Sequence, residues 1–211
     1  EYSTDGKTTW TPYKWDDYSY PKFPGDVITL SDIGDKVYFR AKEVNNTFSS
    51  ATQTYEFSLT GANMSASGDV TTLLNANGVS DLSGTTGGRN WTYCFNGLFI
   101  NCNTLTTTPV LPATTLAEGC YCNMFNGCSA LTTAPELPAT NLAKGCYKSM
   151  FYDCLTLATA PELSATNLAE GCYEQMFVDT ALVTAPELPA TILQPACYRN
   201  MFRNCTQLTS A

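Results

Sequence analysis

Hydrophobic and polar positions repeat from residue 94 to the C-terminus with a period of about 26 residues, a length typical of a solenoid. The block Cys-Tyr-Lys-Ser-Met-Phe begins at Cys146, and equivalent blocks precede and follow it. In a solenoid, equivalent side chains of successive repeats stack in one core. The predicted core columns are Cys94, Cys120, Cys146, Cys172 and Cys197; Cys102, Cys128, Cys154 and Cys205; and Phe125, Phe151, Phe177 and Phe202.

Within one repeat, the pattern predicts a short helix followed by a short strand. Leu142, Cys146 and Met150 lie at positions i, i+4 and i+8, which places them on one face of a helix over about residues 141–151. The sequence Asn-Leu-Ala-Glu at 167–170 has the form of a capping box at the start of such a helix. A strand over 131–134 ends before a proline, which cannot donate a hydrogen bond to a neighbouring strand.

Residues 1–74 predict a small antiparallel β module. The segments 27–30 and 36–40 flank a glycine-containing turn, as the two strands of a hairpin do. Residues 55–60 alternate apolar and polar side chains, which is typical of a half-buried strand. The predicted fold class is therefore α+β: a short-strand/short-helix solenoid, preceded by a small antiparallel β module.

The two parts are joined by residues 75–93, whose Gly, Ser, Thr and Asn content predicts a linker. The solenoid then covers residues 94–211. An open first repeat would expose core side chains and unpaired backbone, so we expect the β module to cover it. We also expect the array to continue beyond Ala211, because the chain stops just inside the next repeat.

Ten cysteines would ordinarily suggest a disulfide framework, but nine of them follow the repeat. Neighbouring repeats about 4.8 Å apart would allow bridges between cysteines of one column. A ladder of buried free thiols is the simpler interpretation, and both remain open. Only Cys122 is off the pattern, and we expect it to be the accessible thiol.

The charge balance narrows the list of partners. Charged residues make up only 14% of the chain, so we expect a surface composed mostly of Thr, Ser, Asn and Tyr. The net charge is −8 with no basic patch, which argues against nucleic acid. No apolar run is as long as the roughly 18 residues of a membrane-spanning helix, so we expect no membrane span in this chain. The charged columns, which alternate in sign from one repeat to the next, are Glu118, Lys144 and Glu170, and Lys148, Glu174 and Arg199.

The sequence contains no histidine, which excludes Ser-His-Asp and Cys-His catalysis and histidine-ligated metals. We therefore predict no enzyme, no catalytic residue, no cofactor and no metal site. The column Glu136, Glu162 and Glu187 could form a paired-acid or Ca²⁺ site. The simpler interpretation is that each glutamate is solvated where a strand ends.

Two regions are candidate ligand-binding surfaces. The first is the solenoid surface that carries Thr132 together with the glutamate column Glu136, Glu162 and Glu187. The second lies near the N-terminus, where aromatic residues alternate with polar ones at Trp10, Tyr13 and Trp15. Aromatic rings with polar neighbours can stack on sugars or bind a protein partner. The alternative is that these rings pack the β module.

The phrases at 131–140 (Leu-Thr-Thr-Ala-Pro-Glu-Leu-Pro-Ala-Thr) and 145–151 (Gly-Cys-Tyr-Lys-Ser-Met-Phe) resemble the leucine-rich repeats of BspA-like surface proteins of Bacteroides and related bacteria. The resemblance covers about residues 25–211. It implies a leucine-rich-repeat solenoid in a secreted or surface-anchored protein with a role in adhesion. The departures are Thr180 in a cysteine column, the shortened step from Cys172 to Cys197 and the Pro195-Ala196 pair.

These observations favour a non-enzymatic recognition or adhesion module that binds a protein or glycan through the solenoid surface. The expected location is extracellular or on a bacterial cell surface. The alternative is a structural spacer or an assembly component of a surface fibre or phage appendage, in which the repeats set a length. Repeat departures clustered on one face would favour recognition, whereas scattered departures would favour a spacer.

Overall fold

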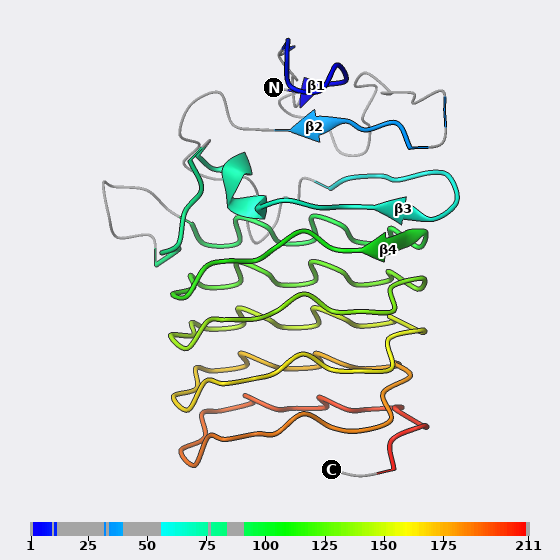
Figure 1. Ribbon diagram of the computed structural model, residues 1–211. Helices are drawn as coiled ribbons and strands as arrows, with labels where there is room; N and C mark the ends of the chain where they lie inside the picture. Colours follow the sequence, from blue (N-terminus) through cyan, green and yellow to red (C-terminus); the bar gives the residue numbers. More distant parts are fainter. Residues whose placement is uncertain are drawn as a thin grey trace, which may run out of the picture.

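The computed structural model describes residues 2–9, 11, 32, 34–39, 56–75, 77–83 and 91–209. From residue 91 the chain winds into coils that stack along one axis, with the strands β1 to β3 at one end and the C-terminus at the other (Figure 1). In each coil, one side is a zigzag of tight turns, which we call the turn side, and the opposite side is more extended, which we call the extended side. The repeat seen in the sequence corresponds to one coil.

Regular secondary structure is short in the described residues. Strands β1 (Tyr2–Ser3) and β2 (Tyr38–Phe39) pair antiparallel. Strand β3 (Met64–Ser65) pairs in parallel with β4 (Leu105–Thr107), which belongs to the first coil. Between β3 and the coils lies one 3₁₀ helix, η1 (Val70–Leu73), whose first turn is capped by the side chain of Asp69. The backbone of the described residues is therefore held together mainly by hydrogen bonds between coils, not by long strands or helices.

The helix predicted for about residues 141–151 is wrong. Residues 144–151 form successive turns, in which Lys148 N–H donates to the carbonyl of Gly145 while Tyr147 N–H donates to the carbonyl of Cys172 in the next coil. Such alternation continues along the turn side: one N–H bonds three residues back and the next bonds to the neighbouring coil. The recurrence of core residues at i and i+4 thus comes from a four-residue turn unit, not from 3.6-residue helical turns.

The strand predicted over residues 131–134 is also wrong, because these residues form no strand in the structure. The equivalent segment of the first coil does form one, as β4, since it lies beside β3. A strand on the extended side is therefore formed where the segment before the coils pairs with it.

Each four-residue turn unit contains one residue in the left-handed conformation. In the second coil these residues are Gly119, Asn123 and Gly127, with φ values of +58°, +53° and +77°. Glycine and asparagine adopt positive φ at low cost, and a helix has no place for such residues at every fourth position. In the second coil these residue types suit the turns, but the equivalent left-handed positions of other coils include Tyr93, Ser149 and Gln175, so the sequence spacing alone does not identify them.

Two of these glycines form a matched pair for a test of stability. At both Gly119 and Gly145, φ is +58°, so alanine at either position costs about 1–2 kcal/mol of left-handed strain. A Cβ at Gly145 would meet nothing closer than 3.9 Å, whereas at Gly119 it would lie 2.2 Å from the ring of Tyr93. That ring would have to move, and its hydroxyl would lose its 3.2 Å bond to Glu118.

We therefore expect Gly119→Ala to lower the free energy of unfolding, measured in urea, by about twice as much as Gly145→Ala. Equal losses for the two variants would mean that Tyr93 moves aside at no cost.

Two columns of parallel aromatic rings fill the interior of the stack. Their centroids lie 5.3–5.9 Å apart and their planes are close to parallel, apart from a 29° tilt at the first step of one column. The columns are Phe95, Tyr121, Tyr147, Tyr173 and Tyr198, and Phe57, Phe99, Phe125, Phe151, Phe177 and Phe202. Tyrosine was expected on the surface together with Thr, Ser and Asn, but Tyr121, Tyr147 and Tyr173 are buried. Offset stacking of this kind adds to the free energy gained by burying the rings.

The segment before the coils is joined to the first coil. Phe57 N–H donates to the carbonyl of Leu98 at 2.7 Å, and Asp69 forms a parallel bridge to the first coil. The antiparallel arrangement predicted up to residue 74 is therefore wrong for β3, and residues 56–60 form no strand. Within the predicted linker, Leu82 and Trp91 are buried in the common core. The first strand of the predicted hairpin, residues 27–30, lies outside the described residues.

None of the helices in the part of the chain that the structure describes is both long and apolar enough to traverse a membrane.

Candidate functional site

The cysteines form hydrogen-bonded columns in the core. All ten are buried and free. In one column each thiol donates to a phenylalanine carbonyl of the coil above, as Cys128 does to Phe99 at 3.1 Å and Cys154 does to Phe125 at 3.2 Å. Thr180 occupies a gap in this column, and its hydroxyl donates to the carbonyl of Phe177 at 2.9 Å. These contacts show thiols that pack and bond to the backbone.

Burial also makes the thiols poor nucleophiles. Desolvation raises the pKa of Cys102 and of Cys172 to about 11, so at neutral pH almost none of either is thiolate. The expectation that Cys122 is accessible is wrong: it is 8% exposed, and burial raises its pKa to about 11. Its sulfur accepts a hydrogen bond from the amide of Asn123 at 3.3 Å.

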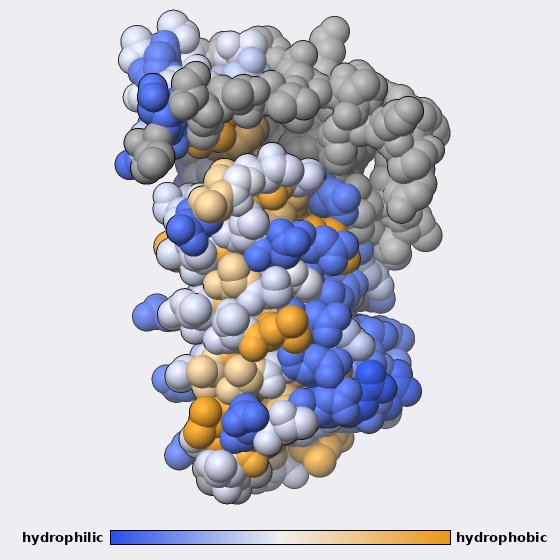
Figure 2. All heavy atoms as spheres, turned by 90° about the vertical axis from the view of Figure 1, so that its right-hand side faces the viewer, coloured by the Kyte–Doolittle hydropathy of each residue, from blue (hydrophilic) through white to orange (hydrophobic). Residues whose placement is uncertain are grey.

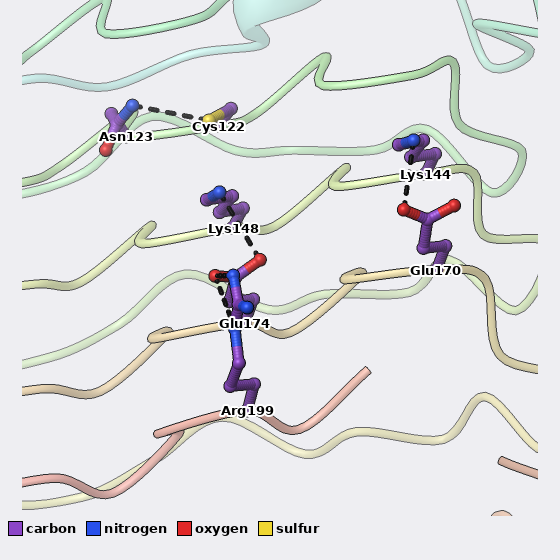
Figure 3. A network of polar contacts seen from close by, with 7 residues as sticks. All are labelled: Cys122, Asn123, Lys144, Lys148, Glu170, Glu174 and Arg199. Atoms are coloured by element: carbon purple, nitrogen blue, oxygen red, sulfur yellow. Dashed lines mark hydrogen bonds and ion pairs between the residues drawn. The ribbon is translucent and has the colours of Figure 1, made fainter. Parts of the chain in front are cut away.

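The turn side carries paired charges (Figure 3). Lys144 Nζ lies 3.0 Å from Glu170 Oε1, and Lys148 Nζ lies 3.3 Å from Glu174 Oε2. Arg199 Nε donates to Glu174 Oε1 at 2.9 Å, so one carboxylate is held between two cations from the coils above and below. These are the contacts that the alternating signs predict.

The sequence did not indicate that the side chain of Glu174 is buried. Its side chain is 8% exposed, while those of Lys148 and Arg199 are 42% and 59% exposed. Burial alone would raise the pKa of Glu174, but the hydrogen bonds and charges of Arg199 and Lys148 lower it below the ordinary value. The carboxylate therefore stays ionised and ties three coils together.

The extended side differs, because its acidic column is not neutralised. Glu136, Glu162 and Glu187 are exposed and follow one another at steps of one coil. None of them forms an ion pair with the residues that the structure describes, and Glu162 accepts a 3.3 Å hydrogen bond from Ser164. The turn-side columns that contain Lys144, Lys148 and Arg199 are thus neutralised by ion pairs, whereas this glutamate column is not.

Threonines flank the glutamates on the same side. Together they form a surface that we call the Thr/Glu face: Thr132, Thr133, Glu136, Thr159, Glu162, Thr184 and Glu187, all of which are exposed. The four site residues that the sequence predicted on the repeats are thus all exposed on the extended side. The other three, Trp10, Tyr13 and Trp15, lie outside the described residues.

A second surface feature comes from the shortened step. The segment Cys-Leu-Thr-Leu at 154–157 corresponds to Thr-Ala-Leu at 180–182, so the fourth coil is shorter at this corner. An open hollow of about 480 Å³ lies here and is lined in part by Leu155, which is 57% exposed. Figure 2 views the side of the stack where β4 begins, and its hydrophobic residues are interspersed with hydrophilic ones.

No group of three or more His, Cys, Asp or Glu side chains in the described residues could hold a metal ion. What the arrangement can do chemically is present carboxylates and hydroxyls in rows of fixed spacing. No family model, curated protein or solved structure matches this chain.

Proposed function

We propose that the chain is a non-enzymatic recognition module, a leucine-rich-repeat type of solenoid that binds a protein or glycan through the Thr/Glu face. The observation that carries this proposal is the uncompensated column Glu136, Glu162 and Glu187. Repulsion between stacked carboxylates disfavours folding slightly, and the columns that contain Lys144 and Lys148 avoid it by alternating signs. A ligand that neutralises or hydrogen-bonds the column would relieve this repulsion.

The geometry favours an extended, repetitive ligand. Carboxylates and threonine hydroxyls accept hydrogen bonds at one-coil steps, so a polypeptide rich in lysine or arginine, or a row of sugar hydroxyls, can bond to several coils at once. Rigid stacking keeps the spacing fixed before binding, which lowers the entropic cost of association. The location that goes with this role is extracellular, on a bacterial surface.

The test is a binding array of glycans and extracellular proteins, followed by affinity measurements on matched variants. Glu162→Gln/Glu187→Gln changes the Thr/Glu face, and Glu118→Gln/Glu170→Gln removes the same two charges from the turn side. We expect the first pair of changes to weaken binding about tenfold or more and the control pair to change it less than about twofold. Equal effects would show that only net charge matters and would contradict a specific face.

A structural role, as a spacer or as an assembly component of a surface fibre or phage appendage, is the second candidate. The regular spacing of the aromatic columns favours it, because such a stack sets a fixed length. The array distinguishes the two roles, since a spacer gives no ligand that depends on the Thr/Glu face.

A further inference from the structure

One corner of the stack is interrupted in the fourth coil. In the third coil this corner reads Cys-Leu-Thr-Leu (154–157) and in the fifth Cys-Thr-Gln-Leu (205–208), whereas in the fourth it reads only Thr-Ala-Leu (180–182). The open hollow of about 480 Å³ lies at this shortened corner, and we call it the notch. Because the fourth coil has a neighbour on each side, the notch results from a feature within the array.

The interruption breaks a ladder of hydrogen bonds that runs along the corner. The hydroxyl of Ser129 donates to the carbonyl of Asn103 in the coil before it at 3.4 Å, and the hydroxyl of Thr156 donates to the carbonyl of Ser129 at 2.8 Å. The next acceptor in the series is the carbonyl of Leu155, which belongs to the notch. The fourth coil lacks the residue that would reach it, and no described residue donates to this carbonyl.

A backbone donor beside the notch is also left free. In the other four coils the N–H of the corner leucine donates to the carbonyl three residues back, as Leu157 does to Cys154 at 3.0 Å. Leu182 makes no such bond, because its corner is one residue shorter, and its N–H has no acceptor among the described residues. A backbone group without a partner lowers stability unless water or a ligand bonds to it.

The polar side chains that line the notch can both donate and accept hydrogen bonds. Asp179 presents a carboxylate, Asn204 and Gln207 present amides, and Thr206 presents a hydroxyl. Within the part of the chain that the structure describes, none of these four side chains takes part in a hydrogen bond or an ion pair. They are therefore available to a ligand.

Leu155 gives the notch an apolar wall. It is 57% exposed. The coils that have a full-length corner carry polar residues at the equivalent position, namely Asn103, Ser129 and Thr206. Two departures from the repeat, an apolar side chain in one coil and a missing residue in the next, thus meet at one place. A sugar ring suits this combination, because its hydroxyls both donate and accept hydrogen bonds while its C–H groups pack on apolar side chains.

We propose that the notch binds one neutral pyranose unit of a glycan. The C–H groups of the ring pack against Leu155, and its hydroxyls bond to the side chains of Asp179, Asn204 and Gln207 and to the free carbonyl of Leu155. The volume of about 480 Å³ lies within the roughly 300–1,000 Å³ of small-molecule sites. The notch is open, so the rest of the glycan can extend into solvent.

Charge selects among ligands. The unpaired carboxylate of Asp179 repels an acidic sugar, which favours a neutral one. A metal ion fits less well, since Asp179 supplies the one carboxylate among the residues that line the notch. The notch lies outside the Thr/Glu face, so this proposal does not depend on what that face binds.

The test is an NMR titration of the isotope-labelled intact chain with free glucose, galactose, mannose and N-acetylglucosamine, with glucuronate as the acidic control. We expect at least one neutral sugar to shift the amide signals of Leu182, Thr206 and Gln207, with a Kd of about millimolar order. Glucuronate should bind at least about threefold more weakly. Unchanged amide signals with all four neutral sugars would overturn the proposal.

Two aspartates form a matched pair of variants. Asp153 and Asp179 occupy the same position of successive coils with φ of +56°, and Asn101 and Asn204 adopt the same left-handed conformation in other coils. Asparagine should therefore be tolerated at both sites. Of the two, only Asp179 lines the notch. We expect Asp179→Asn to weaken sugar binding about tenfold and Asp153→Asn to change it less than about twofold. Equal effects would contradict a site at the notch.

Filling the notch is the complementary test. A threonine inserted after Ala181 gives the corner Thr-Ala-Thr-Leu, which restores the length of the other coils and supplies a hydroxyl for the carbonyl of Leu155. We expect this variant to fold and to lose sugar binding. The Glu162→Gln/Glu187→Gln variant should bind the sugar normally, which separates this site from the Thr/Glu face. An insertion variant that binds sugar as well as the wild type would show that the notch is not the site.

Discussion

Replacing Cys146 by aspartate should destabilise the protein by several kcal/mol, a large part of the roughly 5–15 kcal/mol that holds a typical domain folded. Cys146 is completely buried and lies in one column with Cys120 and Cys172. An aspartate there would have to ionise without a partner between two coils or stay protonated at neutral pH. Either alternative raises the free energy of the folded state, whereas in the unfolded chain the carboxylate is solvated by water.

The matched variants separate charge from packing. Cys146→Ala removes only the thiol and should cost about 1–2 kcal/mol through the small cavity. Lys144→Ala, at a side chain that is 57% exposed, removes the pair with Glu170 and should cost less than about 1 kcal/mol. Thermal and urea unfolding of the three variants measure these differences. Comparable melting temperatures for Cys146→Asp and Lys144→Ala would contradict the division into core and surface columns.

A shortened chain that starts at Gly88 should aggregate or fail to fold, while the intact chain should melt in one transition. Residues 56–83 supply the cover of the first coil: Val70, Leu74 and Leu82 share one core cluster with it, and Phe57 stacks on Phe99 at 5.3 Å. Without them, buried leucines and phenylalanines of the first coil would face water. Each large side chain uncovered in this way costs a few kcal/mol.

Size-exclusion chromatography and calorimetry test this expectation. The informative control is a chain that starts at Glu56, which keeps the cover and omits the residues before it. We expect this longer chain to remain soluble with one transition. A soluble, monomeric product from Gly88 with an unchanged melting temperature would show that the coils are stable without their cover.

Part of the candidate site was visible in the sequence. The outward positions of Glu136, Glu162 and Glu187 follow from their place beside prolines in each repeat, and the alternating charges predict the pairs made by Lys144 and Lys148. The sequence pattern did not show which charged columns are neutralised by ion pairs and which are not. That distinction depends on which residues lie on the same side of a coil.

The sequence by itself determined the period, the columns of cysteine and phenylalanine that fill the interior, and the alternation of charge between neighbouring coils. Each of these depends only on which residues are one repeat apart. The tertiary structure alone decided that residues 144–151 form turns, that Tyr147 lies inside, and that β3 runs parallel to β4. An i, i+4 pattern fits a helix and a four-residue turn equally well. The choice depends on hydrogen bonds to the neighbouring coil, such as that from Tyr147 to Cys172, which no local pattern contains.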